Sequence, residues 1–226
     1  MTDTDNAITL NDGATLIDAW ELPAGRVDEF VARWRERVGL IHTAPGFRDA
    51  RLHRALDPRS RIGLVNVAHW DSIEARDRAL AHPGFTSSAR AATAYATVHG
   101  GWYEVVAALG PAGNGAHGAA GGAEEGPDAP VTFVNAFELP AGRVEEFLAH
   151  WRARAELAAG APGFRDARLH RALDPHTRFQ LVNIAHWDSA EAWRAAVDDP
   201  RFRRLLSASP GFAVAHPALY QVAVAF

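Results

Sequence analysis

The sequence contains no cysteine, which excludes a disulfide framework, a thiolate metal site and a cysteine nucleophile. It also lacks an excess of basic residues: 23 Lys and Arg stand against 27 Asp and Glu, and the arginines are interleaved with acidic residues. The basic stripe of a nucleic-acid-binding protein is therefore missing. No apolar run approaches the length that spans a membrane, and residues 1–13 have neither the basic nor the apolar segment of a signal peptide. We expect a soluble protein of the cytoplasm that binds neither nucleic acid nor membrane.

What the sequence does contain is a long internal repeat. The run APGFRDARLHRALDP at Ala44–Pro58 returns unchanged at Ala161–Pro175, 117 residues further on. With the same shift, residues 16–109 align with residues 133–226 without a gap, and roughly half of the paired positions are identical. Two copies of one domain are therefore predicted.

The boundaries of these copies follow from composition. The first copy is predicted at 14–109 and the second at 131–226, and each is long enough to bury a core of its own. Residues 1–13 are polar and are expected to form a disordered lead-in. Residues 110–130 are rich in Gly and Ala and have no periodicity, so they are expected to form a flexible linker that lets the copies pack together.

Periodicity predicts the same six elements in each copy. A strand at Ala14–Glu21 is followed by a helix with apolar residues at helical spacing, and then by strands at Phe47–Leu56 and Ile62–Trp70. Asp71 and Glu74 have the spacing of a capping box, which predicts a second helix immediately after the third strand. A last strand is predicted at Trp102–Ala108 in the first copy and at Leu219–Val224 in the second. The order βαββαβ is the ferredoxin-like arrangement of an α+β fold.

The segments Ala44–Phe47 and Asn66–Ser72, in this order of elements, resemble the antibiotic biosynthesis monooxygenase family of dimeric α+β barrels. The resemblance covers both copies. Because members of that family pair two chains through their sheets, it implies that the two copies form an intramolecular pseudo-dimer, and an unpaired copy would expose an apolar sheet face.

The resemblance also implies a chemistry. Family members that oxidise anthrone-like polyketides do so without flavin, haem or metal, with an Asn and a Trp four residues apart on the third strand and a His on the second. The matching residues are Asn66, Trp70 and His53 in the first copy and Asn183, Trp187 and His170 in the second. The Asn would stabilise an oxyanion, the Trp would supply a stacking wall, and the His would titrate near neutral pH. The expected partners are a small aromatic substrate and molecular oxygen.

Two alternatives stay open at this stage. A protein of the same fold can be a non-oxidative cyclase or a small-molecule binding module. A haem-degrading branch uses an Asn on the first strand, the same Trp, and a His on the second helix as iron ligand. Asn135 and Trp187 match that branch, but Leu80 and Val197 stand where the iron ligand is expected. A metal site is not expected from the spacing of the histidines.

The two copies are not expected to be equal. Family oxygenases tend to have a Tyr on the second helix, where this chain has Arg76 in the first copy and Trp193 in the second, and Asn135 replaces Asp18. Leu205 and Leu206 also align with Ser88 and Ala89 of the first copy. An apolar pocket of low charge suits a flat aromatic ligand, so we expect the second copy to be the more active one. Its predicted substrate-binding residues are Asn135, Trp193, Leu205 and Leu206.

Overall fold

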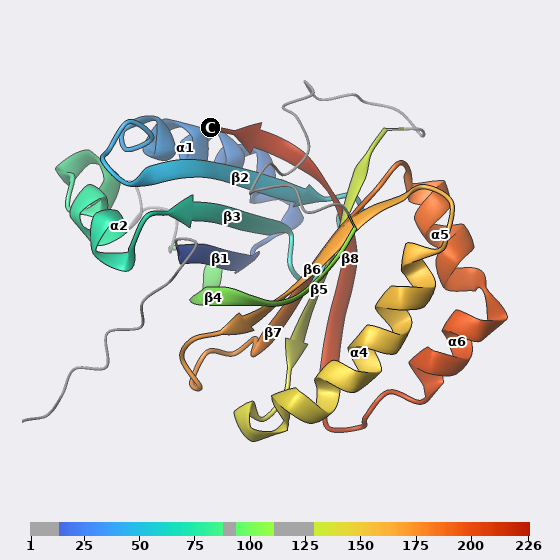
Figure 1. Ribbon diagram of the computed structural model, residues 1–226. Coiled ribbons are helices and arrows are strands. Elements are labelled where there is room, and N and C mark those ends of the chain that lie inside the picture. Colours follow the sequence, from blue (N-terminus) through green and yellow to red (C-terminus); the bar gives the residue numbers. More distant parts are fainter. Residues whose placement is uncertain (1–13, 88–93, 111–128) are drawn as a thin grey trace, which may run out of the picture.

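The computed structural model describes residues 14–87, 94–110 and 129–226 (Figure 1). The predicted lead-in, most of the predicted linker, and Ser88 and Ala89 lie outside the described residues. The elements of the first half are β1 (Ala14–Glu21), α1 (Val27–Gly39), β2 (Phe47–Ala55), β3 (Leu64–Trp70), α2 (Ile73–Leu80) and β4 (Thr97–Leu109). Those of the second half are β5 (Val131–Glu138), α4 (Val144–Ala159), β6 (Phe164–Ala172), β7 (Leu181–Trp187), α5 (Ala190–Asp198), α6 (Pro200–Ser207) and β8 (Val214–Ala225). No helix of these segments is long and apolar enough to cross a membrane.

Local chemistry explains where the helices begin. The hydroxyl of Ser72 caps α2 by accepting a hydrogen bond from the main-chain N–H of Ala75 at 3.1 Å, and Ser189 caps α5 in the same way. The capping residue is therefore Ser72 and not Asp71, the residue that the sequence pattern favoured. Gly46 adopts a φ of +89° just before β2, and a side chain there would meet the Cβ of Ala75 at 2.6 Å, so only glycine fits.

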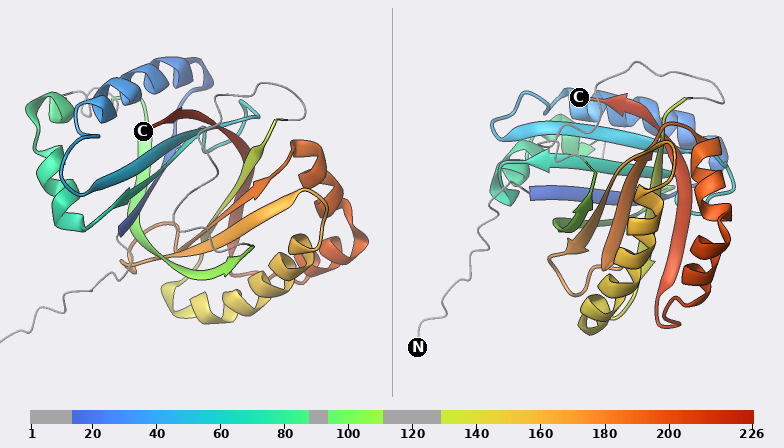
Figure 2. Two further views of the ribbon diagram at one scale, coloured as in Figure 1. Left: turned by 45° about the horizontal axis from the view of Figure 1, so that its top comes forward. Right: turned by 45° about the vertical axis from the view of Figure 1, so that its right-hand side comes forward.

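The eight strands form one closed barrel with the order β1-β3-β2-β8-β5-β7-β6-β4. The last strand of each half crosses to the other half: β4 pairs with β6, and β8 pairs with β2 (Figure 2). Both last strands begin five residues before the predicted starts at Trp102 and Leu219, at Thr97 and Val214. This extension gives them the length to bridge the halves. The intramolecular pseudo-dimer is thus joined through strand pairing as well as through its buried sheet faces.

The barrel interior is a core shared by both halves. It contains Val65 and Val182, which are 1% and 2% exposed, and Tyr103 and Tyr220, which are 1% exposed each. The helices lie outside the barrel, with α1 and α2 over one half and α4, α5 and α6 over the other (Figure 1). Each helix layer buries a second core against the outer sheet face. Phe226, just after β8, packs against the core of the first half, and the centroids of its ring and the Trp34 ring are 6.0 Å apart.

Candidate active site

A carboxylate and an amide meet on the outer sheet face of the first half, beneath its helices. Asp18 on β1 lies directly opposite Asn66 on β3, and the Asn66 Nδ2 donates a hydrogen bond to the Asp18 Oδ2 at 3.0 Å. Trp70 lies four residues further along β3 on the same face. Asn66 and Trp70 share this face because alternate residues of a strand point to the same side, and Leu16, Asp18 and Trp20 share one side of β1 for the same reason.

This pair opens onto a cavity of about 300 Å³ between the sheet and the helices, at the small end of the range typical for small-molecule pockets. Its polar lining consists of Asp18, Asn66, Arg37 and Arg76. The remaining wall is apolar and largely aromatic, formed by Leu16, Trp20, Trp34, Val38, Ile41, Phe47, Ala50, Ala68, Trp70, Leu80, Phe85 and Val98. A flat aromatic ligand with polar substituents matches such a lining.

Burial raises the pKa of the Asp18 carboxyl above its usual value. The hydrogen bond from Asn66 and the positive charges of Arg76 and Arg37 oppose this rise without cancelling it. A carboxylate with a raised pKa is a stronger base than an ordinary one, so Asp18 is suited to accept a proton from a bound ligand. Gly100 on the neighbouring strand makes room for it, since a Cβ there would lie 2.3 Å from the Asp18 Oδ1. The sequence did not predict this role, because Asp18 was regarded only as a charge that makes the first pocket less suited to an aromatic ligand. Its position, a carboxylate on an otherwise apolar and buried strand, could have indicated the role.

The equivalent region of the second half is arranged differently. Asn183 accepts a hydrogen bond from the indole Nε1 of Trp151 at 3.1 Å, so its amide oxygen is engaged by the protein. The Trp193 ring packs against Phe133 with centroids 5.2 Å apart, in the position where the first half has Arg76 and Leu16. The structure brings Asn135 and Asn183 together as neighbours across β5 and β7. Leu206 is 44% exposed on α6.

Both predicted catalytic histidines lie on the opposite side of the sheet. His53 is 3% and His170 1% exposed, and each donates from its Nδ1 to a main-chain carbonyl inside the barrel, that of Val65 and Val182 respectively, at 3.2 Å. Burial lowers the pKa of both to about 4, so both are neutral at physiological pH. The expectation that they act beside Asn66 and Asn183 is corrected by this geometry.

Other histidines also face the barrel interior. His69 and His186 contact Asp49 and Asp166 through their Nδ1 atoms at 2.9 Å. The described residues contain no group of three or more His, Asp or Glu that could hold a metal ion.

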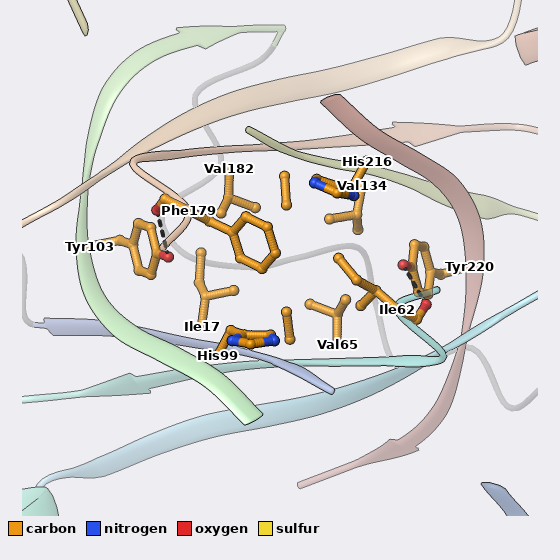
Figure 3. Close-up of a pocket in the computed structure, with 12 residues that line it drawn as sticks. Ile17, Ile62, Val65, His99, Tyr103, Val134, Phe179, Val182, His216 and Tyr220 are labelled. Carbon is orange, nitrogen blue, oxygen red and sulfur yellow. Dashed lines mark hydrogen bonds between the residues drawn. The ribbon is translucent and has the colours of Figure 1, made fainter. Parts of the chain in front are cut away.

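A small cavity at one end of the barrel interior is lined by Ile62, Phe179, Tyr103, Tyr220 and other residues of both halves (Figure 3). Its volume of about 10 Å³ holds at most one water molecule, which excludes it as a substrate site. His99 and His216 border this cavity. Arg178 bridges Glu21 of the first half and Glu138 of the second at 2.7 and 2.8 Å. His99 contacts Arg178 itself, and His216 contacts Glu138 at 2.8 Å.

The cavity of the first half does not fit haem. Among the described residues, its lining includes no His, Cys, Met or Tyr, the side chains that ligate haem iron. Leu80 on α2, at the position where the haem-degrading branch is expected to have its iron ligand, is part of the apolar wall.

A closed barrel made of two ferredoxin-like halves, each carrying helices on its outer face, defines the class of dimeric α+β barrels. The family model described as "Antibiotic biosynthesis monooxygenase" matches the chain twice, at residues 15–91 and 130–207. The chain therefore belongs to the antibiotic biosynthesis monooxygenase family, and the enzyme class of that family is monooxygenase.

Three known proteins illustrate the resemblance. The chain is 35% identical over 71 residues to the mycobilin-producing heme oxygenase of Mycobacterium tuberculosis (strain ATCC 25618 / H37Rv); this covers 31% of the chain and 66% of the relative, slightly less than two thirds of its length. The crystal structure of an anthrone oxidase-like protein matches with a TM-score of 0.66 and 21% identity, over 96% of this chain and 94% of that one. SnoaB, a cofactor-independent oxygenase from Streptomyces nogalater, is 30% identical over 41% of this chain and 92% of its own, with a TM-score of 0.35.

Proposed function

We propose that this protein is a cofactor-independent monooxygenase that oxidises a flat, hydroxylated aromatic compound of the anthrone type, an aromatic polyketide, in the cavity of its first half. The observation that carries the proposal is the Asp18–Asn66 pair, a base of raised pKa hydrogen-bonded to an amide, exposed to a cavity walled by three tryptophans. The sequence favoured the second half as the more active one, whereas this proposal places the active site in the first half. The reason is that Trp193 and Phe133 pack together in the second half.

The proposed reaction begins with removal of a proton. The ionised Asp18 accepts a proton from the methylene carbon between the aromatic rings, and the negative charge spreads onto the ketone oxygen of the substrate. The Asn66 amide has two hydrogens, of which one is used by Asp18, so the other is available to stabilise this oxyanion. Trp20, Trp34 and Trp70 supply flat apolar walls that hold the rings and exclude water.

The resulting anion is electron-rich enough to react with oxygen directly. The methylene carbon loses both of its hydrogens and gains a double bond to one oxygen atom. The second oxygen atom leaves as water with those two hydrogens, so carbon is oxidised and O2 is reduced with no other reductant. The protein has only to remove the proton, stabilise the anion and position the rings.

Oxygen uptake with 1,8-dihydroxyanthrone in metal-free buffer tests the proposal, with the buffer blank subtracted. Wild-type protein should consume oxygen without added cofactor. Asn66→Ala should lower kcat/KM by about 100-fold or more, since it removes one oxyanion donor. Asn183→Ala is the matched control in the second half and should stay within about threefold of wild type.

A strict requirement for flavin or iron, or no uptake across a panel of anthrones, would contradict the proposal. Product formation from the same compounds under strict anaerobiosis would instead support the non-oxidative alternative, a cyclase of the same fold. The Mycobacterium tuberculosis relative is named a heme oxygenase, and Leu80, an apolar residue in the wall of the cavity, speaks against that activity here.

A further inference from the structure

The described residues that line the cavity of the first half carry more positive than negative charge. Two guanidinium groups, of Arg37 and Arg76, line it together with one carboxylate, that of Asp18. Asp77 contacts the Arg76 Nη1 at 2.9 Å, but its side chain is 60% exposed, so water screens much of that interaction. Among the lining residues that the structure describes, one positive charge is therefore in excess of the carboxylate.

The polar atoms around the cavity also show which groups a ligand would complement. Among the described residues, the buried Arg76 Nε and Trp20 Nε1 have no acceptor, and the buried Asn66 Oδ1 has no donor. All three residues line the cavity. Buried polar groups without partners are costly, and a ligand that pairs with them recovers that cost. The complementary ligand offers acceptor oxygens to Arg76 and Trp20 and a hydroxyl to Asn66.

The second half provides an internal comparison. At the positions of Asp18 and Arg76 it has Asn135 and Trp193, so both charges are replaced by uncharged groups. Arg154, the counterpart of Arg37, is retained and donates to Ser209 Oγ at 2.8 Å. The guanidinium of Arg76 is consequently a feature of the first cavity alone, and it is not needed to build the fold, since the second half folds in the same way with tryptophan at that place.

We propose that Arg76 is a specificity-determining residue that binds an anionic oxygen group, a carboxylate, on the aromatic substrate of the first cavity. This inference rests on the proposed function for the identity of the site and adds the acidic substituent to the substrate class. Arg is the side chain best suited to this role, because its planar guanidinium remains charged and forms paired hydrogen bonds to a carboxylate.

Equilibrium binding of two product-like probes tests the proposal without turnover. Anthraquinone-2-carboxylate and anthraquinone-2-carboxamide have the same rings and differ in charge, and quenching of tryptophan fluorescence reports their binding, since three tryptophans line the cavity. Wild-type protein should bind the carboxylate about tenfold more tightly than the amide. Arg76→Met should abolish this preference while leaving amide binding within about twofold.

Arg78→Met is the matched control, because Arg78 is an exposed residue of α2 that does not line the cavity and its replacement removes the same charge. It should keep the preference for the carboxylate. If Arg76→Met fails to fold, two measurements test the proposal in its place. One is the affinity of wild type for the two probes, and the other is the same comparison in Arg76→Trp, which carries the residue found at this position in the second half. Equal or weaker binding of the carboxylate by wild type, or no binding of either probe, would overturn the proposal.

The two proposals fail separately. A carboxylate preference that depends on Arg76, without oxygen uptake on any anthrone, would support the binding role and contradict the monooxygenase. Oxygen uptake on neutral anthrones with no preference between the probes would support the monooxygenase and contradict the role of Arg76.

Discussion

The phenol hydroxyl of Tyr103 donates a 2.9 Å hydrogen bond to the main-chain carbonyl of Phe179, so a strand of the first half is fixed to the segment that precedes β7 in the second. Tyr220 and the carbonyl of Ile62 make the same contact in the opposite direction, also at 2.9 Å. Both tyrosines are buried in the barrel interior, where an unpaired carbonyl would be costly. The two bonds therefore couple the stability of one half to that of the other.

Replacing these tyrosines should destabilise the whole chain. Tyr103→Phe and Tyr220→Phe should each lower the free energy of unfolding by about 1–2 kcal/mol, because each leaves a buried carbonyl without its donor. Tyr95→Phe is the control, since the buried Tyr95 hydroxyl has no partner among the described residues and its loss should cost little. Urea unfolding measures all three, and equal losses for Tyr103 and Tyr95 would contradict the interpretation.

A charge placed in the shared interior should be more damaging still. Val65→Asp and Val182→Asp introduce an unpaired carboxylate at positions that are 1% and 2% exposed, and each should cost about 3 kcal/mol or more. Val214→Asp on β8 makes the same change at a position 56% exposed and should be tolerated. Thermal unfolding followed by circular dichroism should show one cooperative transition at lowered Tm for the interior variants; loss confined to one half would argue against a common core.

Asp18 should show a conflict between activity and stability. Its folded-state pKa is raised, so the folded protein holds the proton more tightly than the unfolded chain, and stability falls as pH rises above the unfolded value. Asp18→Asn should therefore increase the free energy of unfolding at pH 7 by about 1 kcal/mol while removing oxygen uptake. Asn135→Asp makes the reverse change in the second half and should destabilise without affecting turnover. A stable and fully active Asp18→Asn protein would eliminate Asp18 as the base.

The buried histidines predict a loss of stability in mild acid. The pKa of His53 and of His170 is lowered to about 4, below the unfolded value near 6.5, so the unfolded chain binds more protons as the pH falls through this window. Each of these two histidines should lower the free energy of unfolding by on the order of 2 kcal/mol between pH 8 and pH 5. The double variant His53→Gln, His170→Gln should flatten this dependence in urea unfolding, whereas His176→Gln, at an exposed site, should retain it.

Much of the fold was predictable because the evidence for it is local or is present twice. Because side chains alternate along β3, Val65 and Asn66 lie on opposite faces of the sheet: Val65 lies inside the barrel and Asn66 lines the outer cavity. His53 could not be placed by the same rule. The pairing of β2 with β3 shifts register between Phe47 and Asp49, and this irregularity puts Ala50 and Leu52 on the outer side, so His53 lies inside with Val65.

The closure of the barrel and the choice of half depend on contacts between distant segments. Nothing in the local pattern of Thr97–Leu109 indicates that β4 pairs with β6 of the other half. Likewise, the value of Asp18 as a base depends on its surroundings, namely Asn66 opposite it and Gly100 beside it. From the sequence, the charges of Asp18 and Arg76 were expected to make the first pocket less suited to an aromatic ligand, because the sequence does not show that both line one cavity.

The covalent joining of the two halves has a consequence for how this protein can change. In a dimer of identical chains, every substitution occurs in both subunits, so a change that improves one site is imposed on the other. Here Asp18 and Asn135, or Arg76 and Trp193, occupy equivalent places and are encoded separately. One half is thereby free to specialise in chemistry and the other in support, an asymmetry that a symmetric dimer cannot reach.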